Sequence, residues 1–333
     1  TVVDNFGPRS SGVTRSQTLY NNAQFRGRDD PLILGVSFSE GSKAVFGIYD
    51  MPIGISGLRL ETQFSFSHSE VIGGNFSQLG LKSDGQFAAA ELRYPFVFSP
   101  NWSVYGFAGA AYSNGNTDTG PLEVTNTVGR IAAGTRVFYY DTGTVVQFEN
   151  KFTGLWSRQH NNAGDDYGEY FHYTGLLAAS RAIGSFTLVA EAAWQLTPNH
   201  LLPSSEQFAI GGITTLRAYE LNQFNGDEGA RGRLELRAPN ISLSRLIDRP
   251  DDWLHVVPLV FAETGMVVPY RAVGDKHRRE DYASDVGIGL NLSALSGRFY
   301  GRAMVAKSLD EIQKPLLTTN PKILLEAGIR IQF

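Results

Sequence analysis

Apolar and polar residues alternate along several segments of this chain with the period of two that is typical of β-strands. In residues 186–196 the apolar face carries Trp194, whereas the opposite face carries Glu191. Residues 146–156 repeat the pattern, and their polar face holds charges of both signs at Glu149 and Lys151. Such a face opposite an apolar one is typical of a strand between lipid and a wet interior, although a soluble β-sandwich gives similar alternation.

About sixteen segments follow this pattern, and from the fifth onward their connections alternate between short turns and long loops. Residues 99–102 and 142 are short connections, 71–83 and 158–166 are long ones, and 239–254 is long where a short turn is expected. Long loops on one side and short turns on the other are typical of membrane barrels.

We therefore predict an all-β, antiparallel transmembrane β-barrel of about 16 strands that occupies residues 1–333. The expected strands cover residues 2–8, 14–25, 31–39, 43–50, 57–70, 84–98, 103–115, 125–141, 143–157, 167–181, 184–197, 230–238, 255–268, 282–294, 297–308 and 322–333.

Aromatic residues lie where these strands would cross the membrane interface. They flank two of the short turns, as expected of girdles at headgroup depth; they are Tyr94, Phe96, Phe98, Trp102, Tyr105, Tyr139 and Tyr140. No run reaches the roughly 18 apolar residues that a membrane helix needs. The nearest run, residues 255–269, is interrupted by Glu263 and Gly265. A mean hydropathy of -0.17 does not count against a barrel, because alternation hides the membrane face in the average.

Charge and cysteine content exclude several classes of function. The net charge is -4 and the basic residues are dispersed, which argues against a nucleic-acid partner. The chain has no Cys, so disulfide scaffolds and thiolate metal sites are excluded. The six His residues show no metal-ligand spacing, and the acidic pairs Asp165-Asp166 and Asp251-Asp252 are more typical of solvated loops than of catalytic dyads. We expect no enzymatic activity, no cofactor and no metal.

Two short motifs carry complementary chemistry. Leu216, Arg217, Ala218 and Tyr219 lie in a long glycine-rich loop at about residues 198–229, whose candidate turn glycines are Gly211, Gly212, Gly226 and Gly229. Phe261, Glu263 and Gly265 lie on a later strand. A guanidinium and a carboxylate form charge-assisted, often bidentate pairs. A loop that folds inward to reach a strand implies a hollow structure.

These motifs resemble those of a known outer-membrane superfamily. Residues 216–219 and 261–265 are similar to the V-R-G-[YF] loop and the F-x-D-x-G strand of barrels related to BamA, with Ala218 and Glu263 in place of Gly and Asp. Residues 3–12 resemble the V-D-N-x-G-x-x-x-T-G opening of two-partner-secretion transporters (TpsB, the haemolysin-activator type). Residues 205–212 and 226–229 resemble the S-E-Q-x-x-I-G-G and G-D-x-G runs of the same transporters.

The resemblance implies a translocation pore in the bacterial outer membrane that exports a large exoprotein in a two-partner, type Vb system. It also implies that Arg217 points into the lumen and pairs with Glu263, with Tyr219 packed beside it. The family's POTRA domains and plug helix are not expected within residues 1–333. Ile329, Ile331 and Phe333 resemble the C-terminal signal read by the barrel-assembly machinery. The implied partners are the exported client, outer-membrane lipid and lipopolysaccharide, and that machinery during biogenesis.

Three other functions are compatible with parts of the pattern. An insertase of the BamA type shares the loop and strand motifs and would act through a weakly closed seam between the first and last strands. A passive diffusion porin also has an inward loop, in which Arg217 would belong to a selectivity filter. A soluble β-sandwich binding module is the remaining alternative. The opening motif at residues 3–12 and the run at residues 205–212 favour the transporter.

Overall fold

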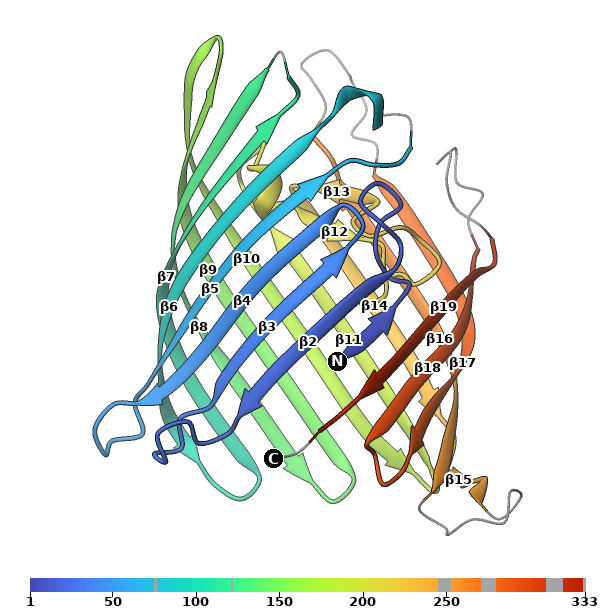
Figure 1. Ribbon diagram of the computed structural model, residues 1–333. Helices are drawn as coiled ribbons and strands as arrows, with labels where there is room; N and C mark the ends of the chain where they lie inside the picture. Colours follow the sequence, from blue (N-terminus) through green and yellow to red (C-terminus); the bar gives the residue numbers. More distant parts are fainter. Residues whose placement is uncertain (75–76, 121, 245–252, 271–279, 310–319, 332–333) are drawn as a thin grey trace.

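The chain forms a closed, antiparallel β-barrel, and the computed structural model describes residues 1–74, 77–120, 122–244, 253–270, 280–309 and 320–331 (Figure 1). Each wall strand pairs with the next one, and β1 closes the ring by pairing with both β19 and β2. Among the described residues no helix is long and apolar enough to cross a membrane. The predicted 16-stranded barrel is confirmed.

The wall strands are β1 (Val2–Asp4), β2 (Arg15–Asn22), β3 (Leu32–Ser39), β4 (Ser42–Pro52), β5 (Arg59–Glu70), β6 (Lys82–Phe98), β7 (Trp102–Asp118), β8 (Glu123–Asp141), β9 (Thr144–Asn161), β10 (Gly164–Ile183), β11 (Phe186–Leu196), β14 (Glu228–Arg237), β16 (Leu254–Val268), β17 (Asp281–Ala294), β18 (Phe299–Ser308) and β19 (Lys322–Ile329). The short strand β15 (Ile241–Ser242) belongs to the same sheet and pairs with β16 beyond the end of β14, whereas β12 (Phe208–Ile210) and β13 (Phe224–Gly226) form a separate pair. Two short 3-10 helices are Ser77–Leu79 and Ser204–Glu206.

One predicted loop is wrong. The long connection expected at residues 158–166 is largely strand, because β9 and β10 remain paired up to Asn161 and Gly164. Both faces of this segment are polar, which removed the alternation on which the prediction relied. Above a membrane a sheet can be wet on both faces, so the hydrogen-bond ladder continues without an apolar face. The long connection between β14 and β16 is present and contains β15.

Large apolar side chains cover the outer face of the wall, as predicted from the alternation. Phe152 and Trp156 on β9, and Leu196 on β11, are each at least half exposed. The opposite face of the same strands carries polar side chains such as Glu191, which forms ion pairs with Arg231 and Arg233 on β14. In water such a surface would be unfavourable, whereas in lipid it is the stable arrangement.

Aromatic residues gather at the short-turn end of β6, β7 and β8. The rings of Tyr94 and Phe96 lie 5.5 Å apart, and those of Trp102 and Tyr139 lie 4.8 Å apart across two strands. Tyr105, which was predicted to be part of the aromatic girdle at the membrane interface, instead faces the lumen. It lies over the Arg93 guanidinium and beside Phe138, because the odd positions of β7 face the lumen together with Phe107.

The seam of the barrel is closed by a very short strand. The prediction placed a strand at residues 2–8, but β1 covers only Val2–Asp4 and pairs over three residues with β19 and over three with β2. The chain then leaves the wall, and the side chain of Phe6 packs into the buried cluster inside the barrel. Asp4 accepts hydrogen bonds from Arg15 on β2, at 2.9 Å to Nε and 3.2 Å to Nη2. The seam thus depends on side chains as well as on backbone pairing.

Asn5 extends the seam by imitating one more rung of strand pairing. Its Nδ2 donates to the carbonyl of Ile323 at 3.0 Å, and its Oδ1 accepts from the backbone N–H of Leu325 at 2.8 Å. Asn5→Ala removes both bonds, so we expect it to lower the free energy of unfolding by about 1–3 kcal/mol. The temperature at which the barrel loses its folded gel mobility should fall. Asn126→Ala is the control, since no hydrogen bond of that side chain is formed with the described residues, and an equal fall in both variants would contradict the assignment.

Candidate functional site

The connection between β11 and β14 folds into the barrel instead of extending outward. Residues 197–227 form this connection, and Figure 1 shows β12 and β13 within the outline of the barrel. Asp227 fixes its far end by accepting the backbone N–H groups of Leu201 at 2.8 Å and Leu202 at 3.0 Å. Gln195 on β11 donates to the carbonyls of Glu206 and Asp227. We refer to residues 197–227 as the lumen loop.

Arg217 at the tip of the lumen loop is buried among carboxylates. Its Nη2 donates to Glu235 Oε2 at 2.7 Å, and its Nε lies 3.3 Å from Glu263 Oε1. The guanidinium also lies 4.1 Å from the centre of the Phe261 ring, within the range of a cation–π contact. The Arg217 side chain is 5% exposed and that of Glu263 is fully buried. Arg217 therefore bridges two strands, β14 and β16, and its shortest bond goes to Glu235.

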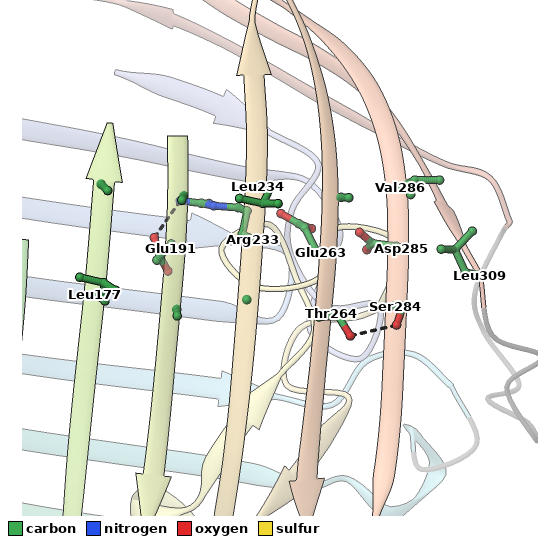
Figure 2. A pocket seen from close by; sticks show the side chains of 15 residues that line it. Leu177, Glu191, Arg233, Leu234, Glu263, Thr264, Ser284, Asp285, Val286 and Leu309 are labelled. Carbon is green, nitrogen blue, oxygen red and sulfur yellow. Dashed lines mark hydrogen bonds and ion pairs between the residues drawn. The ribbon is translucent and has the colours of Figure 1, made fainter. Parts of the chain in front are cut away.

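Two consecutive backbone amides of the loop tip bind two carboxylates of the wall. The N–H of Arg217 donates to Glu263 Oε2 at 2.8 Å, and the N–H of Ala218 donates to Asp285 Oδ2 at 2.7 Å. Glu263 and Asp285 are partners in the register between β16 and β17, and Figure 2 shows them on neighbouring strands. The tip is thus held through its backbone as well as through the guanidinium.

The methyl group of Ala218 causes no strain in this arrangement. Ala218 does not have a positive φ. Its backbone conformation therefore does not require the glycine that stands at this position in the family motif. Ala218 is 4% exposed. The longer side chain of Glu263 reaches both the amide and the guanidinium of Arg217. Both departures from the family pattern are therefore compatible with a pinned loop.

Apolar side chains surround the charged centre. Leu216 and Tyr219 are fully buried, and the hydroxyl of Tyr219 donates to the carbonyl of Ser284 at 3.0 Å. Gly265 leaves the space that Ile210 and Leu216 occupy, because an added Cβ would lie 3.1 Å and 3.3 Å from their side chains. This packing excludes water from the ion pairs, and a dry environment makes each of them stronger.

The tip of the lumen loop also contacts both sides of the seam. Lys322 on β19 donates to the carbonyl of Tyr219 at 2.8 Å and lies 3.8 Å from Glu220. Arg9, which follows β1, lies 3.6 Å from the same Glu220 carboxylate. Phe6 packs in the cluster that contains Leu216 and Tyr219. The loop tip, the last strand and the N-terminal segment therefore form one connected structure.

Glu206 anchors the base of the lumen loop on the opposite side of the barrel. Arg130 on β8 donates through Nε to Glu206 Oε1 at 2.7 Å and through Nη2 to the same oxygen. His172 on β10 lies 3.5 Å from Oε2. Burial opposes ionisation of Glu206, but the contacts with His172 and Arg130 outweigh it and lower the pKa of this carboxyl from 4.5 to about 2.

This anchor predicts a response to acid. A carboxyl whose pKa is lowered on folding contributes stability that is complete above about pH 4.5 and is lost as the pH falls towards 2. We expect the loop to loosen over that interval, with a loss of up to about 3 kcal/mol of anchoring free energy. A spin label on Cys introduced at Leu201, which is 58% exposed and lies in the base of the loop near Glu206, should become mobile as the pH falls. In Glu206→Gln the label should be mobile already at pH 7, and an immobile label in that variant would contradict the anchoring role.

The remaining predicted residues lie in different parts of the molecule. Gly211 and Gly212 lie in the lumen loop with positive φ, Gly226 ends β13, and Gly229 belongs to β14 and not to the loop. The lumen loop covers residues 197–227 instead of 198–229. Ile329 at the end of β19 and Ile331 just after it are exposed, at 46% and 69%. Phe333 lies outside the described residues.

Sequence reasoning missed several residues that hold the loop. Glu235, Asp285 and Lys322 contact the tip, and Arg130 contacts the base. Each lies at a lumen-facing position of a predicted strand, so alternation alone could have placed it inside the barrel. The register between strands, which decides which inward charge meets the loop, is absent from a single sequence.

Comparisons with known proteins give structural neighbours only. No family model matches the chain, and no curated protein sequence matches it. CdiB from Escherichia coli superimposes with a TM-score of 0.76 at 16% identity, covering 98% of this chain and 61% of CdiB. CdiB from Acinetobacter baumannii gives 0.72 at 15% identity, with coverage of 98% and 59%. BamA from Haemophilus ducreyi lacking POTRA domains 1-3 gives 0.63 at 15% identity, with coverage of 98% and 69%.

The fold of these structural neighbours is the same as the fold described above for this chain. The chain spans about three fifths of the CdiB chains that it matches. Identities of 15–16% establish the arrangement of strands and nothing finer. A closed ring of 16 strands, an apolar outer face and a wet, charged interior are the features of a barrel that crosses a membrane. The chain has the fold of the bacterial outer-membrane barrels of the CdiB and BamA type.

Proposed function

We propose that this barrel is the pore of a two-partner-secretion transporter, which exports one large protein across the outer membrane. The observation that carries the proposal is the agreement between motif and geometry: each run that resembles the transporter family performs a defined task in the structure. CdiB, the neighbour with a TM-score of 0.76, is itself a transporter of this type. The BamA neighbour supports the coarser assignment to protein transport at the outer membrane.

The run at residues 205–212 and the run at residues 226–229 hold the two ends of the lumen loop. Glu206 binds Arg130, and Asp227 caps the backbone at Leu201 and Leu202. The opening motif closes the seam, through Asp4 with Arg15 and through Asn5 with β19. A pore that carries a chain through its lumen needs a closed wall and a defined internal loop, and these residues supply both.

The lumen wall suits a polar, extended polypeptide. Charges of both signs line it, and many are paired: Arg136 with Glu149, Arg93 with Asp50, and Arg233 with Glu191. Paired charges keep the wall hydrated without one strong field that would bind a client side chain tightly. Export of a client that folds outside needs no nucleotide, because folding on the far side draws the equilibrium outward.

A BamA-like insertase is the second candidate, and one observation favours it. β1 pairs with β19 and with β2 over only three residues each, so the seam is paired over a shorter length than any other two neighbouring wall strands. A short seam is easier to open for an incoming strand. Asn5, Asp4 and the contacts of Lys322 and Arg9 with the lumen loop strengthen this seam, which is why we favour export.

Secretion in a heterologous bacterium tests the choice. The full-length native protein and a candidate exoprotein from the same organism are co-expressed, and the exoprotein in the medium is measured with and without the barrel. Release that depends on the barrel is the result expected of a transporter. Absence of release, with unfolded outer-membrane proteins accumulating when the native gene is depleted, would favour the insertase.

A further inference from the structure

The β9–β10 hairpin rises above the rest of the barrel and leaves one edge of β10 open. It is the yellow-green hairpin at the upper left of Figure 1. β9 pairs with β10 along its whole length, from Gly164 to Arg181. β11 pairs with β10 only from Tyr173 to Ile183, because β11 ends at Leu196. Residues 164–172 of β10 therefore have a strand on one side only.

The cause of this open edge is the lumen loop. After Leu196 the chain turns into the barrel at Thr197 instead of continuing upward beside β10. Two side chains at the start of the loop fill one rung: Asn199 Oδ1 accepts from the N–H of Phe171 at 2.8 Å, and the Thr197 hydroxyl donates to the carbonyl of Phe171 at 2.6 Å. Beyond that rung no described residue pairs with the edge.

The rung at Phe171 shows which backbone groups the edge presents. In an antiparallel ladder the residues that direct N–H and C=O to one side alternate along the strand. Since the backbone N–H and C=O of Phe171 point to the open side, the same groups of Glu169, Tyr167 and Asp165 do so as well. These three residues present an N–H and a C=O each, and no hydrogen bond from the described residues reaches them on that side.

The side chains along the edge indicate the kind of partner. Residues 164–172 contain neither Lys nor Pro, which many proteins place on edges to prevent pairing. Asp166 and Glu169 form no ion pair with the described residues, and Tyr167 is 68% exposed. A second copy of this acidic strand would meet like charges across the ladder and be repelled. A neutral or basic extended strand fits.

We propose that residues 164–170 of β10 form a docking edge for the exported protein, which adds to the sheet as a transient extra strand when it leaves the lumen. The proposal rests on the proposed export function, because that function delivers an extended chain to the mouth where the edge lies. Backbone pairing of this kind binds an extended segment through its main chain and tolerates many sequences. It also gives the emerging chain a first template for β-structure outside the membrane.

Cross-linking tests the docking directly, and the chain has no native Cys to interfere. A single Cys is introduced by Tyr167→Cys in the full-length protein, and a client stalled during export carries single Cys residues at successive positions. Disulfides that form at every second client position are expected, because alternate side chains of a paired strand lie on the same face. Thr127→Cys on β8 is the control, since Thr127 pairs with Asn114 and Arg158 on its two neighbouring strands.

A proline tests whether the backbone groups matter. Glu169→Pro removes an N–H that faces the open side, so the ladder with β9 stays intact, and Glu169→Ala controls for loss of the carboxylate. We expect Glu169→Pro to slow release of the client by roughly fivefold, the change that corresponds to one hydrogen bond of about 1 kcal/mol, and Glu169→Ala to export normally. Tyr167→Pro should repeat the effect if Glu169→Pro assembles poorly.

The outcomes separate this proposal from the function on which it rests. Barrel-dependent export with no alternating cross-links, and with both proline variants at the normal rate, overturns the docking edge and leaves the transporter intact. Cross-links between two copies of Tyr167→Cys in place of client cross-links also overturn it, because the edge then pairs with itself. Absence of barrel-dependent export in the unaltered protein overturns the export function first.

Discussion

Replacing Arg217 with Ala should abolish secretion while leaving an assembled barrel. Arg217 pairs with both Glu235 and Glu263, which are buried with it; Glu235 keeps a second partner in Arg237, whereas no other ion pair of Glu263 is formed with the described residues. Removal of one partner from a buried ion pair costs about 3–5 kcal/mol, because the other charge stays desolvated. The loop tip is therefore expected to leave the wall, whereas the strand ladders around the ring keep the barrel closed.

Secretion of the client and the folded gel mobility of the barrel are the two measurements for this variant. We expect export to fall at least about a hundredfold, the change that corresponds to about 3 kcal/mol, with unchanged mobility. Arg217→Lys is the informative control: it keeps the charge but lacks the fork that spans two carboxylates, so it should recover only part of the activity. Normal export by Arg217→Ala would remove the loop tip from the mechanism.

Gly211→Ala should have an effect of similar size for a different reason. Gly211 has a φ of 114°, a conformation that residues with a side chain rarely adopt. An added Cβ would also lie 2.2 Å from the carbonyl oxygen of Glu220, which is backbone and has little freedom to move. Strain of this kind costs about 1–3 kcal/mol before the clash is counted. The segment that carries Arg217 and Glu220 should therefore be displaced.

A matched substitution separates strain from site-specific effects. Gly54 also has a positive φ, of 66°, but an added Cβ would meet no atom within 4 Å. Gly54→Ala should therefore export the client at nearly the normal rate, whereas Gly211→Ala should export little and should free a spin label attached in the lumen loop. Equal export by the two variants would show that the close approach of Gly211 to Glu220 has no part in function.

The strands could be predicted because lipid on one side and water on the other impose a clear alternation. β11, predicted at 184–197 and found at Phe186–Leu196, is an example. The prediction failed where that contrast ends. Above the membrane, β9 and β10 continue with two polar faces, and at the seam β1 stops after Asp4 because Phe6 packs inside the barrel. Both errors come from tertiary surroundings that a local pattern does not contain.

The loop motif was visible in the sequence, but its partners were only partly so. Complementary charge suggested Glu263 for Arg217, and the structure places the two together along with Glu235. Asp285 was missed because it binds the backbone of Ala218, and a backbone amide has no signature in a sequence. Lys322 was missed because its contact with Tyr219 joins residues about a hundred positions apart. Such contacts depend on barrel closure, which sets the register of every strand.

Transfer of the client through purified, full-length protein in lipid vesicles tests the central claim most directly. Unfolded client is added outside vesicles that contain the barrel, without any nucleotide, and its protection from added protease is followed with time. A transporter should give client that becomes protected only in vesicles with the barrel, and Arg217→Ala vesicles should give almost none. Client that stays accessible, while an unfolded outer-membrane protein added to the same vesicles inserts and folds, would contradict the export account.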